Sequence, residues 1–462
     1  MPVLEGVSGS IAAWPGYPDA VRGGGFVFTS GVRGGRSEGP PLSYDDLTAE
    51  HRAQSQGFTL VDGLDGEITA DAWRAHRNLD RILANAGSQS SQILRQRMWQ
   101  RDKRFFPILE RVRKGWQPEA APSSGLGVSA IGGRSGGWYG IECIAVDSAD
   151  SERLGNRRML TPAEHAAYPS TSIYSQMVAS GPFVFLAGHI PIRTTEPGKP
   201  VVASFDDVPQ EGRFLATGRS HPDARDGPIA AQSWFVYNEI RRTLTLHAMN
   251  MRDIVHVRVY LDDLRDFATF HRVHMHFFGD RAPALSVVGF AEVGHKGCRI
   301  EIEPTALQPN TMPRTDYGWS CPAPHAGPAA VGAGPLLFLA GMLGLGPDGK
   351  LVEDSKSVPA QARSLVRSLE RETSEPCVPA QIWWIWERMR RVCAHAGVPL
   401  ESIAKTVVYL RHEGDLHAYE SIRATFMTNH NPAFDCVLVP SPGPVPATSV
   451  QVDAVALRPN DA

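Results

Sequence analysis

Hydrophobic and polar positions along this chain follow one pattern three times. A short apolar segment that ends in glycine occurs as FVFTSG, FVFLAG and LLFLAG, closing at Gly31, Gly188 and Gly341, at intervals of 157 and 153 residues. After each comes a tryptophan, then an isoleucine 20 residues later and a proline 29 residues after that: Trp73, Ile93 and Pro122; Trp234, Ile254 and Pro283; Trp383, Ile403 and Pro432. Periods this long are typical of repeated domains rather than of a solenoid.

The apolar spacing within the second copy predicts its secondary structure. Trp234, Tyr237, Ile240 and Leu244 share one face of a helix. The run IVHVRVYL at 254–261 alternates apolar and polar residues, which predicts a half-buried strand, and a second amphipathic helix follows. Each copy is thus predicted to fold as a hairpin, a helix, a strand, a helix and two strands. This is an α+β layer, in which two helices cover one face of one sheet.

A sheet covered on one face needs a cover for the other face. Three copies in one chain therefore predict three sheets that cover one another about a pseudo-threefold axis, with the sheets inside and the helices outside. The predicted domains are residues 1–147, 166–308 and 322–459, with linkers near 148–170 and 308–324. Residues 194–228 are interpreted as an irregular excursion of the second copy and residues 357–372 as an added helix of the third.

Composition excludes several classes of function. The 46 basic and 49 acidic residues give a formal charge of −3, which leaves no cationic surplus for binding nucleic acid. No apolar run has membrane-spanning length and no secretory signal opens the chain, so we predict a cytoplasmic protein without a membrane partner. The six cysteines form no CxxC pair, and there is no phosphate-cradling glycine loop. We therefore predict that the protein works without a metal or an organic cofactor.

Longer motifs of the second copy resemble a known family. The segments IYSQMVASGPFVFLAGHIP, VRVYLDDLRDFATFHRVHMHFFGDRAPALS and IEIEPTAL are similar to those of the reactive intermediate deaminase superfamily (Rid, or YjgF), and the other two copies match more weakly. The resemblance implies a chorismate-mutase-like trimer, here fused into one chain, with ligand clefts between neighbouring units. It also implies a small-molecule substrate and a cofactor-free deaminase chemistry.

The chain departs from the family pattern at the position that matters most for substrate binding. The resemblance implies an arginine that binds the substrate carboxylate, but the corresponding residues are Ser124, Leu285 and Phe434. A bidentate guanidinium cannot be replaced by leucine or phenylalanine. Other family positions are held in part: the carboxylate as Glu142, Glu303 and Asp453, the tyrosine as Tyr17 and Tyr174 but Gly327 in the third copy, and the asparagine as Glu110, His271 and Glu420.

The first copy has an unusual strand that offers a substitute for the missing arginine. In LRQRMWQRDKR the residues Arg95, Arg97, Trp99 and Arg101 alternate on one face. If this face lines a cleft, Arg97 or Arg101 could bind an anionic substrate; the alternative is a solvated or salt-bridged strand.

Two other features of the sequence could have either a functional or a purely structural role. Ser123 or Ser124 could be a nucleophile if a base adjoined it, although a serine in a turn is the commoner case. His271 and His274, at i and i+3 of a helix, could bind a metal, although packing is the commoner role of such a pair.

Two hypotheses about function follow. The first is a cofactor-free enzyme that hydrolyses a C–N bond of an imine, enamine or related metabolite. Its site is expected in the first copy, with Glu142 as the base and Tyr17 and Arg97 orienting the substrate. The second copy, with Glu303, Tyr174 and His271, is the next candidate. The alternative hypothesis is a small-molecule-binding or regulatory module that kept the scaffold and lost catalysis.

Overall fold

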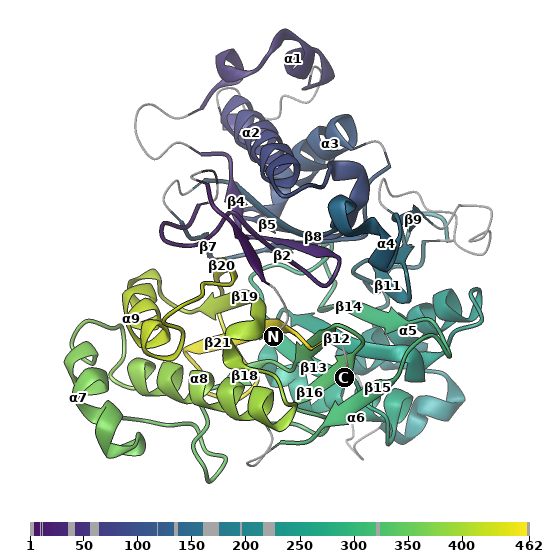
Figure 1. Ribbon diagram of the computed structural model, residues 1–462. Coiled ribbons are helices and arrows are strands. Elements are labelled where there is room, and N and C mark those ends of the chain that lie inside the picture. Colours follow the sequence, from purple (N-terminus) through teal and green to yellow (C-terminus); the bar gives the residue numbers. More distant parts are fainter. Residues whose placement is uncertain are drawn as a thin grey trace.

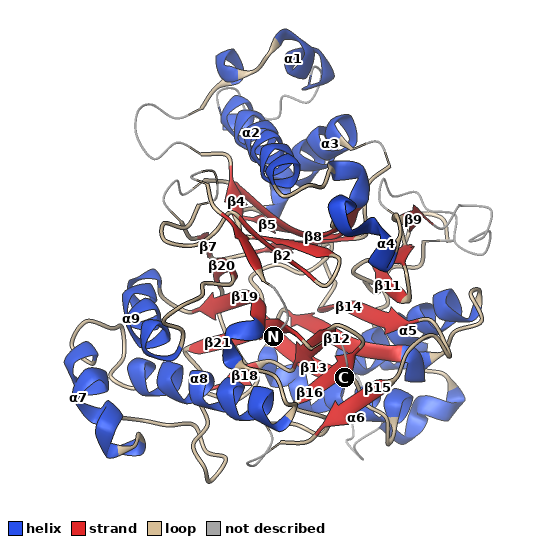
Figure 2. Cartoon of the chain, in the orientation of Figure 1, coloured by secondary structure: helices blue, strands red, loops and turns tan. Residues whose placement is uncertain are grey.

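The computed structural model describes residues 4–9, 11, 13–35, 42–55, 64–117, 119–133, 137–159, 175–194, 196–215, 227–319 and 324–459. Within these residues the strands form three sheets, which lie toward the middle of the molecule, and the longer helices lie outside them (Figure 1). Figure 2 shows helices and strands mixed in each part of the chain. The predicted α+β class is confirmed.

The first sheet uses strands from the N-terminal part of the chain. Its order is β1 (Glu5–Val7), β2 (Ala20–Gly23), β3 (Phe26–Thr29), β8 (Tyr139–Val146), β5 (Ile93–Gln100) and β6 (Ser123–Gly127), and β4 (Val32–Arg33) also pairs with β8. Helices α1 (Ala49–Ser55), α2 (Leu64–Asn85) and α3 (Phe106–Trp116) belong to this part, and α2 packs against α3. The short helix α4 (Ser151–Leu154) leads toward the second sheet.

The second and third sheets repeat this plan. The second has the order β13 (Ala284–Gly289), β12 (Ile254–Leu261), β14 (Ile300–Leu307), β11 (Phe183–Leu186), β10 (Met177–Ser180) and β9 (Arg158–Met159), with helices α5 (Gly227–Thr245) and α6 (Phe267–Phe278). The third has the order β15 (Arg314–Tyr317), β16 (Ala330–Ala333), β17 (Leu336–Leu339), β21 (Val450–Leu457), β19 (Ile403–Leu410), β20 (Ala433–Leu438) and β7 (Ala130–Ile131), and β18 (Met342–Leu343) pairs with β21. Its helices are α7 (Ala360–Leu369), α8 (Val378–His395) and α9 (Leu416–Phe426).

One local irregularity recurs in all three sheets. The antiparallel ladder shifts register just after Ile93 in β5, after Ile254 in β12 and after Ile403 in β19. A β-bulge re-aims the side chains that follow it. The same bulge after the same isoleucine supports the structural equivalence of the three copies.

Some of the predicted boundaries need correction. The segments expected to be linkers contribute strands, because β9 pairs with β10 of the second sheet and β15 pairs with β16 of the third. Strand β7, from within residues 1–147, pairs with β20 of the third sheet. The added helix expected over 357–372 is present as α7. In the excursion 194–228, the described residues include two short 3₁₀ segments before α5 begins at Gly227.

Backbone hydrogen bonds connect the three sheets in a closed cycle. The N–H of Gly31 donates to the carbonyl of Phe434 (2.9 Å), that of Gly188 to Ser123 (3.1 Å) and that of Gly341 to Leu285 (3.1 Å). The bonds therefore run from the first sheet to the third, from the second to the first and from the third to the second. We name these places the first–third, first–second and second–third junctions.

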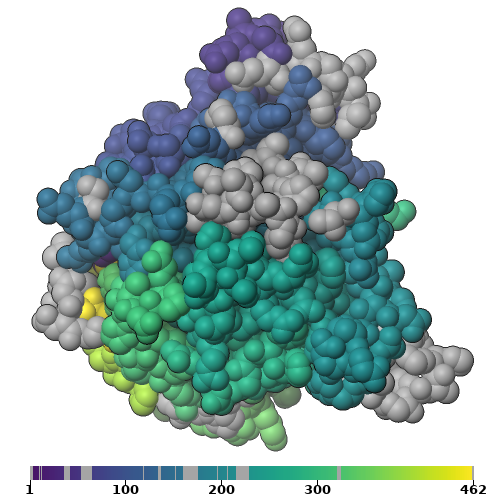
Figure 3. Space-filling view, turned by 90° about the vertical axis from the view of Figure 1, so that its right-hand side faces the viewer, coloured from purple at the N-terminus to yellow at the C-terminus, as the bar shows by residue number. Residues whose placement is uncertain are grey.

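Apolar side chains are buried both beneath the helices and between the sheets. Each set of helices covers a core of its own, and two further cores take residues from all three sheets. One shared core includes Phe26, Phe183 and Phe338, and the other includes Trp99, Tyr260 and Tyr409. Strand β12 was expected to be half-buried, but all eight of its residues are buried, because helices cover one face and the other sheets cover the opposite face. In the space-filling view the teal residues of the second copy lie beneath the blue residues of the first copy (Figure 3).

Asp71 of α2 makes the stability of this part dependent on pH. Its buried carboxylate accepts hydrogen bonds from the backbone N–H groups of Trp138 (2.7 Å) and Tyr139 (3.0 Å), and burial raises its pKa from 3.8 to about 6. The folded state holds this proton more tightly than the unfolded chain does. The resulting stability is therefore fully present below about pH 4 and is lost as the pH rises through about 6.

We expect Asp71→Asn to remove this loss, which amounts to at most ~3 kcal/mol. Urea unfolding of both proteins across this pH window is the measurement. Relative to the native protein, the free energy of unfolding of the variant should increase as the pH rises. Parallel profiles of the two proteins against pH would contradict the prediction.

Candidate functional site

Three buried carboxylates lie on the inner faces of the sheets. Glu142 lies opposite Arg97 in the first sheet, Glu303 opposite Arg258 in the second, and Asp453 opposite Val407 in the third. All three are at most 2 % exposed. The strands thus bring the predicted family carboxylates to equivalent places around the centre of the molecule.

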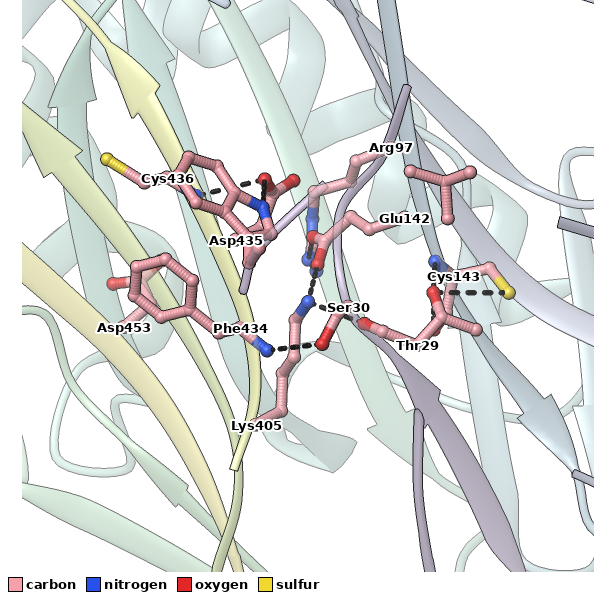
Figure 4. Close-up of polar contacts among 12 residues, drawn as sticks. Thr29, Ser30, Arg97, Glu142, Cys143, Lys405, Phe434, Asp435, Cys436 and Asp453 are labelled. Atoms are coloured by element: carbon pink, nitrogen blue, oxygen red, sulfur yellow. Dashed lines mark hydrogen bonds and ion pairs between the residues drawn. The ribbon is translucent and has the colours of Figure 1, made fainter. Parts of the chain in front are cut away.

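Each of these carboxylates is held by a cation from a neighbouring sheet. Lys405 pairs with Glu142, Arg97 with Glu303 (2.7 Å) and Arg258 with Asp453 (2.7 Å). Figure 4 shows Lys405 reaching the Glu142 carboxylate, with the Arg97 guanidinium on the other side of it. The charged strand of the first copy is therefore salt-bridged and buried.

The ion pairs keep Glu142 and Glu303 ionised. Burial alone would raise the pKa of Glu142, but Lys405 and Arg97 lower it to about 2. Burial acts on Glu303 in the same way, and the guanidinium groups of Arg95, Arg97 and Arg258 hold its pKa well below the ordinary value. Neither group exchanges a proton near neutral pH, so neither is suited to act as a general base there.

Glu301 differs from both. It lies two residues before Glu303 on β14, so that its side chain points to the same face of the sheet, and it is 3 % exposed. Burial raises its pKa to about 7, and the nearby charge of Glu303 acts in the same direction. Two neighbouring carboxyl groups with pKa values driven apart are typical of an acid and base pair.

Ser124 connects the two carboxyl groups. Its hydroxyl donates a hydrogen bond to Oε2 of Glu303 (2.8 Å) and also contacts the Glu301 carboxyl. The Ser124 hydroxyl and the charge of Lys103 both lower the pKa of Glu301, but burial outweighs them. Glu301 therefore keeps a raised pKa beside an ionised Glu303.

Gly188 closes over this pair at the first–second junction. A Cβ atom at this residue would lie 1.9 Å from Oε1 of Glu301 and 2.7 Å from the Ser124 hydroxyl oxygen. Glycine is therefore required for the Glu301 carboxyl to occupy its place. Lys103, whose charge acts on Glu301, is half-buried, and so are Phe106 and Gly125, which it contacts.

We expect Gly188→Ala to push the Glu301 carboxyl aside and to lower its pKa toward the ordinary value. Infrared titration of the carboxyl groups measures this shift. Gly414→Ala is the matched control, because a Cβ atom at Gly414 would meet nothing within 4 Å. An unchanged titration in Gly188→Ala would show that the close approach does not set the protonation of Glu301.

The first–third junction is filled by its own side chains. Tyr17 stacks on Phe434 with ring centroids 4.2 Å apart, and its hydroxyl donates to Glu420 (2.5 Å). Asp435 accepts from Arg33 (2.6 Å) and from the Trp99 indole (2.7 Å). No hydrogen bond or ion pair within the described part of the chain joins Tyr17 to Glu142, so the predicted base and its orienting tyrosine have separate partners.

The second–third junction gathers histidines. His271 lies 6.1 Å from His274 and 6.4 Å from His325 between ring centroids, and the Tyr237 hydroxyl bonds Nδ1 of His274 (2.7 Å). Burial lowers the pKa of His274 well below its ordinary value and that of His325 to about 4. Within the described ranges, no group of three or more histidine, cysteine or acidic side chains is arranged to hold a metal ion.

The remaining predicted residues lie apart from the Glu301 pair. Arg101 is exposed and stacks over the Trp138 ring at 5.1 Å, so it is not beside Arg97 in the buried network. Glu110 pairs with Arg113 (2.7 Å). Tyr174 lies outside the described residues.

The assignment of Ser124 to the family arginine position is wrong by one residue. The carbonyl groups that accept the three junction hydrogen bonds belong to Ser123, Leu285 and Phe434, so Ser123 is the equivalent residue. Ser124 lies opposite Arg97 and faces the centre. The parallel pairing of β5 with β6 sets this register, which gapless alignment of the sequence did not reveal.

Sequence reasoning missed Glu301, although a signal was present. The residues at the equivalent position, opposite Trp99, Tyr260 and Tyr409, are Gly140, Glu301 and Gln451. The second copy alone places an acid there. Two glutamates that alternate in the strand IEIEPTAL share a face, and this pattern could have identified the pair.

Comparison with known proteins agrees with the residue pattern. The family model described as Endoribonuclease L-PSP matches residues 164–308. The RutC family protein PH0854 of Pyrococcus horikoshii is 30% identical over 135 residues, which are 29% of this chain and 86% of that protein. Protein MMF1, mitochondrial, of Saccharomyces cerevisiae is 27% identical over 152 residues, 33% of this chain and 86% of that protein. A chorismatase crystal structure overlaps 79% of this chain and 93% of its own, with 12% identity and a TM-score of 0.46.

These matches confirm the resemblance seen in the sequence. The chain belongs to the reactive intermediate deaminase (Rid, or YjgF) superfamily. Among the described helices none is both long and apolar enough to cross a membrane.

Proposed function

We propose that this chain is a cofactor-free hydrolase that cleaves a C–N bond of a small imine or enamine, and that it works at the first–second junction. The observation that carries the proposal is the Glu301–Ser124–Glu303 arrangement. Glu301 has a pKa of about 7, whereas Glu303 stays ionised because its pKa is lowered. Membership of the superfamily supports a small-molecule substrate. The proposed site therefore lies in the second copy, at Glu301, and not at Glu142 of the first copy as the sequence predicted.

The chemistry needs a group that can both take and give a proton. Water adds to the C=N carbon as Glu301 in its ionised form accepts a proton from that water, and the nitrogen receives a proton in turn. Glu301, ionised again once it has given the first proton to the nitrogen, takes the proton of the new hydroxyl and passes it to the nitrogen. The C=O bond forms as the C–N bond breaks, the amine leaves, and Glu301 is ionised as at the start. A pKa near the working pH makes both forms of Glu301 available.

Arg113 is the candidate that replaces the family arginine. From α3 its guanidinium donates to the hydroxyl of Ser123 (2.9 Å), the residue now placed at the family arginine position. Arg113 is buried and also pairs with Glu110 (2.7 Å), so an anionic group of the substrate would have to compete with Glu110 for this charge.

The assembly belongs to the same proposal. We propose that the three copies are Rid-type domains with chorismate-mutase-like folds, in a pseudo-threefold single-chain trimer, with the boundaries 1–147, 166–308 and 322–459 extended to include β9 and β15. The cycle of junction hydrogen bonds and the repeated bulge support this arrangement.

A small-molecule-binding module is the second candidate. It is favoured by the ion pairs that occupy Glu142, Glu303 and Asp453, since these leave the family carboxylates no free role in proton transfer. In that case the first–second junction would bind a metabolite without converting it.

One assay separates the two candidates. An amino acid oxidase generates short-lived 2-imino acids in the cuvette, and the release of ammonia is timed with and without the protein. The hydrolase proposal predicts faster release than in buffer. Saturable binding of the 2-oxo acid by calorimetry, with no acceleration over a panel of imines and enamines, would instead establish the binding module.

A further inference from the structure

We infer that Lys103 at the first–second junction captures small carbonyl compounds, short aldehydes and 2-oxo acids, as a covalent Schiff base. The chain has only seven lysines, and this one lies beside the Glu301–Ser124 pair. The inference goes beyond the proposed hydrolysis, because the bond is formed to the protein itself and can be detected without any C–N cleavage of a substrate.

The position of Lys103 is set by contacts on both sides of the junction. Its ammonium group donates to the carbonyl of Gly125 (2.7 Å), the residue after Ser124, and lies 5.6 Å from the centre of the Phe106 ring. Its backbone N–H donates to the Glu292 carboxylate from the second sheet's side (2.9 Å). The side chain is therefore held at the half-buried edge of the junction, between solvent and the carboxyl pair.

The surroundings favour an amine that can lose its proton. Burial lowers the pKa of Lys103. Nearby acids raise this pKa in part, and Glu301 has the largest effect among them. A lysine with a depressed pKa beside a carboxylic acid that titrates near neutrality combines a nucleophile with a proton donor. Covalent capture of a carbonyl carbon needs both.

The step balances without an added reagent. The neutral amine of Lys103 attacks the carbonyl carbon, and the proton that the nitrogen loses passes to the oxygen to give a carbinolamine. Glu301 then protonates the hydroxyl, which leaves as water while the nitrogen lone pair forms the C=N bond. The proton released from nitrogen restores the Glu301 acid, and hydrolysis runs the same steps in reverse.

Borohydride trapping tests this directly. The full-length protein is incubated with glyoxylate at pH 7, reduced with sodium borohydride and digested for mass spectrometry. We expect one carboxymethyl group on the Lys103 peptide, at a level at least about ten times that on Lys350 or Lys356, which are exposed. Equal labelling of the three lysines would overturn the inference.

Two variants give independent checks. Lys103→Arg keeps a positive charge but has no reactive amine, so labelling at this site should vanish while the circular dichroism spectrum is unchanged. Glu301→Gln should slow capture by about tenfold or more, because the carbinolamine loses its proton donor.

The outcome is separable from that of the hydrolase proposal. Labelling of Lys103 without imine hydrolysis would support the Schiff base and contradict the hydrolase proposal. Imine hydrolysis without labelling of Lys103 would support the hydrolase proposal and contradict the Schiff base.

Discussion

Glu301→Gln is expected to lower the rate of C–N hydrolysis by a factor of ~10²–10⁴, the usual cost of removing a positioned acid or base. Glutamine preserves the shape of the side chain but cannot exchange a proton. The dependence of the rate on pH around 7 should therefore disappear together with the rate. Steady-state measurements from about pH 5.5 to 8.5 on both proteins, with imine generated in the cuvette, provide the comparison.

The matched control is the same substitution outside the junction. Glu372 is exposed and pairs with His417 in the third copy (3.4 Å), so Glu372→Gln should leave both the rate and its pH profile unchanged. A mild loss in Glu301→Gln, with a large loss in Glu142→Gln, would return the site to the first copy. Equal losses in both would indicate a general effect on folding.

Arg97→Met is expected to have the largest effect on stability. The guanidinium of Arg97 contacts Glu303 through Nε and Nη2 and Glu142 through Nη1 (2.5 Å), and all three side chains are buried. Removing one partner of a buried ion pair leaves an uncompensated charge, which costs ~3–5 kcal/mol. Urea unfolding at pH 7 measures the change in the free energy of unfolding.

A second substitution separates charge balance from packing. Arg97→Met with Glu142→Gln removes one cation and one anion together, so the double variant should recover a substantial part of the loss. Arg252→Met, which breaks an exposed pair with Asp280, should have little effect because solvent screens such a pair. No recovery in the double variant would assign the loss to packing instead.

The sequence predicted the elements well because apolar spacing determines them locally. The tryptophan, isoleucine and proline of each copy lie in a helix, at a strand start and just before a strand, and their fixed spacing predicted three similar layers. Boundaries were less predictable. The short strands β9 and β15 have few apolar residues of their own and form by pairing with edge strands, which is a tertiary effect.

The site was less predictable than the fold for two physical reasons. Parallel pairing of β5 with β6 sets which of Ser123 and Ser124 faces the centre, and a slip of one residue exchanges the faces of a strand. The roles of the carboxylates depend on which cation reaches them from another sheet. Glu303 and Glu301 are chemically identical in the sequence, and only the guanidinium groups around Glu303 separate their pKa values.

The proposed site depends on Glu301 holding its proton near neutral pH at the first–second junction. Carboxyl infrared titration of protein labelled with ¹³C-glutamate, recorded as the difference between the native protein and Glu301→Gln, measures this proton directly. We predict a protonated carboxyl band that disappears with a midpoint near pH 7 in the native protein and is absent from the variant. A midpoint below about pH 5, in the ordinary range of glutamate, would show that Glu301 is ionised at neutral pH and cannot be the acid of this site.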